Sequence, residues 1–413
     1  MLRTTLRIGV LSTGVSDLAN RVHEAGGEPV PLIFPKARPK GGVALVREWL
    51  ADATQISCSH EHLDALLVGA ERPEEVAGLV LTALRLNLPT VAAPPRDARL
   101  FAILAGLGLV PLAADPTEIA LKAAGCGGPR PLELVEDFSL ANAVRVAYSL
   151  GDGPETIVHL SAIAREAEVL GFSQMLRVLV PETPLLAEPD SPWLMEHGVA
   201  GLFAHLGETL NDTRTVEGRL REILPPEPPA PPPRVESRLV FVEGRASGTV
   251  ALCRLTGSQK EVSGECRVLD SEKFAVRVVE GSFFDPDSLL VVGGCGPRGG
   301  PGLLRLDLLA QSLHESGLEE RTSVITDGLP PREARGTWVS LISPEAAAGG
   351  VTGRLRDGDT LRIDLVEGRI RTGVRAGELE DRDLYKFPDP ASPGYAARYA
   401  RSALPALEGA GFE

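Results

Sequence analysis

A proline-rich segment divides this chain. Seven of the ten residues 225–234 are proline, in the run LPPEPPAPPPR that begins at Leu224. Neither a helix interior nor a central strand tolerates that density, because proline lacks the backbone N–H that both elements need. The run therefore predicts a stiff, extended linker, residues 224–237, between two folded parts. The length of 413 residues agrees, since one hydrophobic core rarely serves so long a chain. A ligand for a proline-recognition module is the other interpretation.

Before the linker, short apolar runs alternate with stretches of helical periodicity. Such alternation is typical of a mostly parallel sheet covered by helices. We therefore expect residues 1–223 to form an α/β domain that is mainly helical from residue 140 onward. The expected strands are residues 6–11, 30–34, 65–68, 90–92 and 109–112, and the expected helices include 17–24, 43–53 and 74–85.

Beyond the linker the apolar residues follow a period of two, and Gly and Asp separate the runs. Many short strands at fairly even spacing predict an all-β, barrel-like domain, residues 238–375, with one helix at 303–316. The remaining residues 376–413 are expected to form a tail with a short helix at 394–407. The expected strands are residues 239–242, 249–255, 289–292, 323–325, 338–342, 360–364 and 370–374.

The charge balance excludes several classes of partner. The chain has a net charge of −14, whereas nucleic acids and anionic membranes require a basic face. Neither a transmembrane span nor a signal peptide is apparent, so we expect a cytoplasmic protein. The five cysteines are scattered without metal-ligand spacing, which favours reduced thiols over a zinc site. The 36 arginines against six lysines point to a heat-adapted source.

Two glycine-rich passages are the most unusual local sequences. The run GGCGPRGGPG, residues 293–302, follows an apolar strand and precedes a helix, so its backbone N–H groups suit an anion. A tight strand-to-helix connection without a ligand explains the same residues equally well. The second passage contains TDG at 326–328, SPEAAAGG at 343–350 and DGD at 357–359, which are typical of hairpin turns and a helix start. His159 lies on an apolar helical pattern and is expected in the core.

These passages together resemble the dihydroxy-acid dehydratase/6-phosphogluconate dehydratase family. Residues 296–302 are similar to its GPKGGPGM loop, and the second passage is similar to its TDGRFSGG, SPEAAxGG and DGD motifs. Further similarities run in order through most of the chain. They are residues 81–89 (MASLRLNIP in the family), 151–167 (GGSTNxVLHLxAIAxEA), 268–272 (VFDSEE) and the tail segment 394–399.

The resemblance implies a fold, a reaction and cofactors. The family combines an N-terminal α/β domain with a C-terminal β-barrel, is usually dimeric, and removes water from 2,3-dihydroxy acids or aldonic acids. An iron–sulfur cluster acts there as the Lewis acid for the leaving hydroxyl. A Mg²⁺ held by carboxylates and a modified lysine binds the substrate, and a serine alkoxide removes the proton.

Residue by residue, the resemblance implies that this equipment is missing. The family's C-D-K triplet corresponds to Arg72, Pro73 and Glu74. Its Mg²⁺-binding glutamate corresponds to Arg305, and its catalytic serine corresponds to Pro331. The acidic D-D-G stretch and two further cluster cysteines have no counterparts in residues 34–47, 11–22 and 92–100. We therefore expect no cluster, no Mg²⁺ and no catalytic residue of the family type.

Three functional hypotheses follow. The first is a pseudoenzyme that keeps the dehydratase fold and has a binding or regulatory role. The second is an active dehydratase or lyase on a 2,3-dihydroxy acid or aldonic acid that uses a diverged, cluster-free mechanism. Its acid or base would come from Glu71, Glu74, Asp327 or His159. The third, which overlaps the first, is an accessory partner of an intact dehydratase instead of a homodimer.

The family resemblance also predicts a change of charge at the position of the family's active site. Basic residues replace the carboxylates and thiolates that hold the family's cofactors. Basic residues stand at or near the former ligand positions, so they either pair with Glu71 or Glu74 or hold a small anionic ligand. The alternative is that these arginines point to solvent. Lys36, Arg38 and Lys40 add to the basic character of neighbouring loops. The candidate residues for this cleft or anion site are Arg72, Glu74, Arg298, Gly299, Gly300, Gly302, Arg305, Asp327, Gly328, Arg332 and Ser343.

Overall fold

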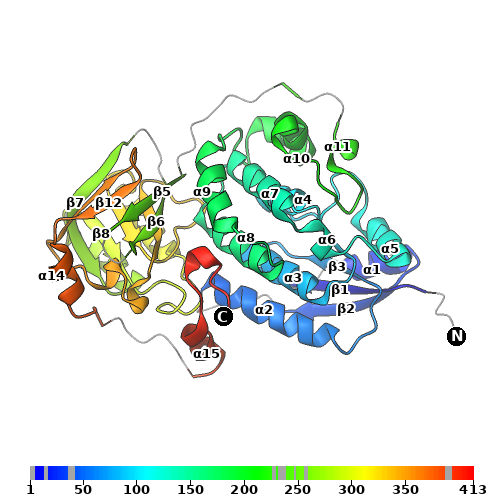
Figure 1. Ribbon diagram of the computed structural model, residues 1–413, viewed down its shortest axis with the longest axis horizontal. Coiled ribbons are helices and arrows are strands. Elements are labelled where there is room, and N and C mark those ends of the chain that lie inside the picture. The colour runs from blue at the N-terminus through cyan, green and yellow to red at the C-terminus, as the bar shows by residue number, and fades with distance from the viewer. Residues whose placement is uncertain are drawn as a thin grey trace. The chain divides into compact units, whose positions relative to one another are not determined.

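The computed structural model divides into two compact units (Figure 1). Unit 1 consists of Met1–Arg38, Val46–Asp152 and His159–Ser237, and unit 2 of Pro39–Leu45, Gly153–Val158 and Arg238–Glu413. The two short early segments of unit 2 were not expected from the sequence. Most of the predicted linker, like Lys36, Arg38 and Lys40, lies outside the described residues, so its boundaries stay a prediction. The described residues are 5–13, 17–35, 42–225, 229–230, 239–245, 248–254, 259–386 and 393–413.

Unit 1 contains a four-stranded parallel sheet with the order β2-β1-β3-β4, which confirms the expected α/β class. In the two central strands, residues 8–12 of β1 and residues 65–68 of β3 are buried, as strands covered on both faces must be. The strands are β1 (Arg7–Thr13), β2 (Glu28–Phe34), β3 (Ala65–Gly69) and β4 (Thr90–Ala92).

Helices supply the rest of unit 1. Both α1 and α5 contact the sheet, whereas α7 packs on α4 and α9. Two helices, α2 and α8, have their first turns in unit 2. The helices are α1 (Leu18–Glu24), α2 (Val43–Cys58), α3 (Pro73–Leu86), α4 (Ala98–Gly106), α5 (Pro116–Cys126), α6 (Pro131–Leu134), α7 (Asp137–Ser149), α8 (Pro154–Glu166), α9 (Phe172–Glu182), α10 (Pro192–Leu206), the 3₁₀ turn η1 (Gly207–Thr209) and α11 (Leu220–Ile223).

One expected strand is absent. Residues 109–112 are not a strand, although Leu109 and Val110 are buried. The Leu109 carbonyl accepts a hydrogen bond from Ala92 N at 2.8 Å beside β4. Pro111 follows two residues later and has no N–H to donate. The prediction of a fifth strand there was wrong, because apolar character alone does not distinguish a strand from a buried loop.

Unit 2 is built on a closed barrel with the strand order β10-β6-β5-β12-β11-β7-β8-β9, which confirms the barrel-like prediction. Its strands are β5 (Leu239–Gly244), β6 (Val250–Arg254), β7 (Glu261–Leu269), β8 (Leu289–Val292), β9 (Ser323–Thr326), β10 (Trp338–Ser343), β11 (Thr360–Asp364) and β12 (Arg369–Thr372). Its helices are α12 (Glu272–Glu280), α13 (Asp307–Glu315), α14 (Ala376–Asp381) and α15 (Tyr395–Ser402). The two helical predictions at 303–316 and 394–407 were therefore several residues too long.

The period of two in the sequence corresponds to two hydrophobic clusters. In β8, Leu289 and Val291 belong to one cluster, and Leu290 and Val292 belong to the other, which includes residues of α12 and α13. Alternate side chains of a strand point to opposite faces, so one strand contributes to both clusters. The strand β7 and helix α12 were not predicted. Within the described residues, no helix combines the length and apolarity needed to cross a membrane.

Candidate functional site

The parallel pairing of β8 with β9 assembles the loops that the sequence singled out. Val292 pairs with Thr326 at the carboxyl ends of the two strands. The glycine loop, residues 293–302, and the Asp327-Gly328 pair follow directly, so they lie next to each other. The carboxyl ends of parallel strands are where α/β proteins commonly build binding sites.

The Asp327 side chain connects its own segment by hydrogen bonds to the glycine loop and to the segment that follows β10. Its carboxylate accepts hydrogen bonds from the backbone N–H groups of Gly294 at 3.1 Å, Cys295 at 2.8 Å and Ala346 at 2.8 Å. The residue is completely buried, and that burial raises the pKa of its carboxyl group. The expected hairpin turn at Asp327-Gly328 was wrong, because β9 and β10 pair in parallel. Asp327 is a buried connector, with its charge compensated by backbone dipoles.

The glycine loop contacts a carboxylate of the same chain. Glu345 accepts hydrogen bonds from Arg298 N at 2.9 Å and Gly299 N at 2.9 Å. Burial, and secondarily the charge of Asp327, raise the pKa of Glu345 to about 7. The amides that were expected to face an anion therefore donate to this protein carboxylate. Glu345 was not among the candidate residues, although the SPEAAAGG motif contains it.

The remaining glycines of this loop support close packing. Gly300 N donates to Gly296 O, and Gly302 N donates to Pro297 O, both at 3.0 Å. Gly302 has a φ of +93°, and a Cβ there would lie 2.3 Å from Leu45 Cβ. Its carbonyl accepts from Ala44 N at 2.7 Å, in the first turn of α2. The loop thus forms the tight connection that the sequence offered as one of two interpretations.

Arg305 is held by carboxylates of unit 2. Its Nη1 lies 3.1 Å from Glu155 Oε2, and its Nε lies 3.4 Å from Asp307 Oδ1. The Glu155 side chain is 2% exposed and that of Arg305 is 26% exposed, so this ion pair is largely removed from water. The pKa of Asp307 is raised by burial, which the guanidinium of Arg305 partly opposes. Glu155 is a partner that sequence reasoning missed, although it lies in the resembling segment 151–167.

The other candidates of unit 2 are engaged in the same framework. The Arg298 guanidinium donates from Nε to Ala403 O at 2.9 Å. Gly328 N donates to the Thr326 hydroxyl at 3.0 Å. The Arg332 carbonyl accepts from Arg254 at 2.5 Å. Ser343 ends β10 and pairs with Val250.

Arg72 and Glu74 lie in unit 1, at the start of α3. Arg72 pairs with Glu75 at 2.8 Å and with Glu74 at 3.4 Å. Glu75 also accepts a hydrogen bond from Thr13 Oγ1 at 2.8 Å, and both glutamates are about 1% exposed. The expected ion pair with Glu74 is present, whereas the closer contact with Glu75 was not predicted. Glu71 instead accepts from Arg96 N at 2.9 Å.

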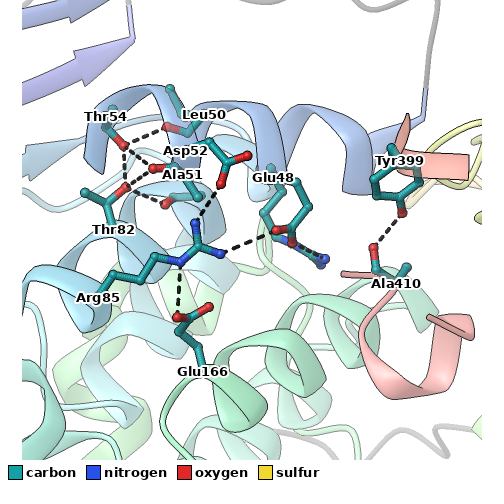
Figure 2. A network of polar contacts seen from close by, with 12 residues as sticks. Glu48, Leu50, Ala51, Asp52, Thr54, Thr82, Arg85, Glu166, Tyr399 and Ala410 are labelled. Atoms are coloured by element: carbon teal, nitrogen blue, oxygen red, sulfur yellow. Dashed lines mark hydrogen bonds and ion pairs between the residues drawn. The ribbon is translucent and has the colours of Figure 1, made fainter. Parts of the chain in front are cut away.

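His159 is buried in unit 1, as expected for a core histidine. Its Nδ1 lies 3.3 Å from Arg47 Nη1, and Arg47 also pairs with Glu48 at 2.8 Å. A guanidinium can only donate, so Nδ1 acts as the acceptor in this contact. Figure 2 shows the adjoining network, in which Arg85 reaches Glu48, Asp52 and Glu166 at 3.5, 3.0 and 3.1 Å. The network joins helices α2, α3 and α8, which indicates a structural role.

Side chains that could ligate a metal are dispersed among the described residues. Among them, no three His, Cys, Asp or Glu side chains gather as a bound metal would require. Burial raises the pKa of the Cys266 thiol to about 12 and that of Cys295 well above its usual value. Neither cysteine stands at a position that the family resemblance assigns to a cluster ligand.

Comparisons with known proteins identify the family. Residues 227–410 match the family model described as "Dihydroxy-acid/6-phosphogluconate dehydratase C-terminal". The chain is 30% identical over 305 residues to the dihydroxy-acid dehydratase of Geobacter metallireducens, covering 68% of this chain and 55% of that protein. It is 32% identical to that of Citrifermentans bemidjiense over 68% of this chain and 55% of the relative. Dihydroxy-acid dehydratase 2 of Bordetella bronchiseptica is 29% identical over 71% and 55%, respectively.

These matches agree with the barrel of unit 2 and with the motifs at the ends of β8, β9 and β10. The chain is a diverged member of the dihydroxy-acid/6-phosphogluconate dehydratase family. It spans about half the length of the curated relatives that it matches.

Proposed function

We propose that this chain is a non-catalytic member of the dehydratase lineage that binds a ligand or partner instead of eliminating water. In this proposal, internal ion pairs stand at the positions where the family holds its cofactors. The chain acts as a homodimer or as an accessory partner of an intact dehydratase.

The observation that carries the proposal is the ion pair between Arg305 and Glu155, at 3.1 Å. The family resemblance assigns a Mg²⁺-binding glutamate to position 305. An arginine offers only donors and a positive charge, so it repels a cation instead of coordinating it. The buried Glu155 carboxylate needs a counter-charge, and the guanidinium supplies it.

The residues at the other cofactor positions do not fit the family's cofactors either. Arg72 pairs with Glu74 and Glu75, which occupies carboxylates that a cation would need. The resemblance assigns Arg72 to the position of a cluster cysteine, and a guanidinium has no lone pair available to ligate iron. The proposal therefore includes neither an iron–sulfur cluster nor Mg²⁺.

The second candidate is an active lyase with a cluster-free mechanism, and one observation favours it. The carboxyl of Glu345, with a pKa of about 7, exchanges its proton near neutrality, as a general acid or base must. Its contacts speak against that role, because it is 6% exposed and accepts from Arg298 and Gly299. A substrate would have to displace both donors to reach it.

The test combines metal analysis with an activity assay. The chain is purified without oxygen, and its iron, sulfide and Mg²⁺ are quantified. Formation of 2-keto acids is then followed with 2,3-dihydroxy acids and aldonic acids, beside an intact dehydratase as the positive control. We expect no stoichiometric cofactor and no product above the enzyme-free rate. Stoichiometric iron together with product would contradict the proposal, and product without iron would establish the second candidate.

A matched variant sharpens the metal test. In Arg305→Glu, a second carboxylate faces Glu155, so Mg²⁺ should raise the melting temperature of this variant. The native protein should show no such shift, because Arg305 repels the cation. A Mg²⁺-dependent shift of the native protein that Arg305→Glu abolishes would oppose the proposal.

A further inference from the structure

A cavity of about 640 Å³ lies within unit 1, among α7, α9 and the turn η1 that follows α10. Its volume is in the range of small-molecule sites. None of the candidate residues discussed above lines it. The cavity therefore shares no lining residue with the candidate site that the family resemblance indicated.

Two buried polar groups of α7 line this cavity. Arg145 and Ser149 are four residues apart, so they lie on the same face of the helix. Ser149 is completely buried. Within the described part of the chain, neither Arg145 Nη1 nor Ser149 Oγ has a hydrogen-bond partner, and both atoms are buried.

Buried donors without partners are costly, and a charged one is the most costly. A guanidinium edge and a hydroxyl beside it match the two oxygens of a carboxylate. The pair therefore indicates a place for the anionic group of a ligand.

The same cavity also carries acidic and apolar side chains. Glu182 and Glu208 line it from exposed positions at the end of α9 and in η1. Leu179, Leu186 and Leu206 give it an apolar wall. The two carboxylates disfavour a dianion such as phosphate and favour a cationic group near the carboxylate. The apolar wall suits a hydrocarbon side chain.

We propose that this cavity binds a free α-amino acid with an apolar side chain. The carboxylate of the ligand contacts Arg145 and Ser149, and its ammonium group faces Glu182 and Glu208. The leucine side chains cover its hydrocarbon portion. This site goes beyond the proposed function, since it stands whether or not the chain has dehydratase activity.

The test measures binding to the full chain by calorimetry and thermal shift. The twenty common amino acids are screened, with L-leucine as the first probe. Two matched probes each lack one feature: 2-hydroxy-4-methylpentanoate lacks the ammonium group, and 3-methylbutylamine lacks the carboxylate. A third probe, inorganic phosphate, is an anion without the ammonium group and the hydrocarbon. We expect an apolar amino acid to bind about tenfold or more tightly than any of the three.

Variants assign the binding to this cavity. Arg145→Met should weaken binding about tenfold to a hundredfold, because a charged hydrogen bond is lost. Glu208→Gln, in an exposed turn that should not disturb folding, should weaken amino acid binding and leave the hydroxy acid unaffected. Arg177→Met serves as the control, because Arg177 is an exposed residue of α9 outside the cavity lining, and it should bind normally.

Three results would overturn the proposal. One is that no amino acid binds, another is that phosphate or the hydroxy acid binds as tightly as the amino acid, and the third is that Arg145→Met and Glu208→Gln both retain native affinity. These binding results do not depend on the cofactor and activity assays. The proposed function can therefore be wrong while the amino acid site is correct, and the amino acid site can be wrong while the proposed function is correct.

Discussion

Glu345 and Glu155 each hold a group that the sequence comparison had assigned to binding or catalysis. Glu345 accepts from the glycine loop, and Glu155 pairs with Arg305. Both carboxylates are almost fully buried, so each depends on its donors to compensate its charge. The two glutamates therefore have structural roles. Each role can be tested by a glutamine substitution, which removes the negative charge and keeps the size of the side chain.

The first prediction concerns the titration of Glu345. Its pKa of about 7 in the folded protein lies above the ordinary value of 4.5, so the folded state keeps a proton that the unfolded state loses. The free energy of unfolding therefore falls as the pH rises from about 4.5 to 7, by at most about 1.4 kcal/mol per pH unit. Glu345→Gln stays neutral and removes this contribution. Melting temperatures measured from pH 4.5 to 8 should shift in favour of the variant up to about pH 7 and change little above it.

The control for this series is Glu280→Gln, an exposed glutamate at the end of α12. It removes one carboxylate from an exposed position, so it measures the effect of losing a negative charge without burial. A difference between Glu345→Gln and the native protein that does not change with pH would show that burial does not raise the pKa of Glu345.

The second prediction concerns the ion pair of Arg305. Arg305→Met leaves the Glu155 carboxylate buried without the counter-charge of Arg305, so the free energy of unfolding should fall by about 1–3 kcal/mol. Partial exposure of Arg305 keeps the loss below that of a fully buried pair. Denaturant titrations of Arg305→Met, Glu155→Gln and the double variant measure the coupling. Additive losses would mean that the two side chains do not interact.

At the scale of elements, the glycine loop connects β8 to α13 and contacts the first turn of α2. Gly42 N donates to Pro301 O at 2.9 Å, and Val43 N donates to Leu303 O at 3.1 Å. The first N–H groups of a helix have no partners within the helix, so the loop carbonyls serve as its cap. This contact requires that the two backbones approach closely. Glycine allows that approach because it has no Cβ.

The third prediction tests that approach. Gly302→Ala places a Cβ 2.3 Å from Leu45 Cβ on a residue with a φ of +93°, so both the contact and the backbone conformation oppose it. We expect the free energy of unfolding to fall by about 1–3 kcal/mol. Gly377→Ala is the matched control, because Gly377 lies in helix α14 with nothing within 4 Å of an added Cβ. It should be neutral or slightly stabilising, and equal melting temperatures for the two variants would count against the packing role.

The sequence predicted the positions of most helices and strands, but not how the strands pair. Periodicity located β4, β8 and β11 to the residue, because buried apolar runs bounded by turn residues are a strong local signal. It missed β7, whose run EVSGECRVL contains three charged residues on a largely apolar pattern. It also read Asp327-Gly328 as a hairpin, since local turn residues do not reveal whether the next strand pairs parallel or antiparallel.

The candidate site was predictable only in part, for the same reason. The motifs identified Asp327, Gly299 and Arg305, which the fold brings to one end of β8 and β9. Their partners depend on tertiary contacts across long stretches of chain. Glu155 lies 150 residues before Arg305, and Glu345 lies 46 residues after Gly299, so no local pattern links them.

At the scale of the whole molecule, unit 2 is discontinuous along the chain. Besides Arg238–Glu413 it includes Gly153–Val158 and Pro39–Leu45. The two short segments supply Glu155 for Arg305 and the helix turn that the glycine loop caps. A fragment cut at the predicted linker therefore lacks contacts that unit 2 has in the full chain.

The fourth prediction follows from that discontinuity. A fragment of residues 238–413 should show faster amide hydrogen exchange in residues 296–305 than the full chain does. Strands β11 and β12 pair with each other within the fragment, so their exchange should change little and serves as the internal control. Equal protection of the loop in both proteins would mean that the early segments do not stabilise it.

The separation between Glu155 and Arg305 also bears on how the chain is made. A ribosome adds about 5–20 residues per second, so the 150 residues between them take roughly 8–30 seconds to synthesise. During that interval the nascent chain carries Glu155 before its counter-ion exists, and the first turn of α2 waits even longer for the carbonyls of Pro301 to Leu303. Unit 2 can therefore complete its folding only after all of unit 1 has been translated, so the order of translation constrains the order in which the two units fold.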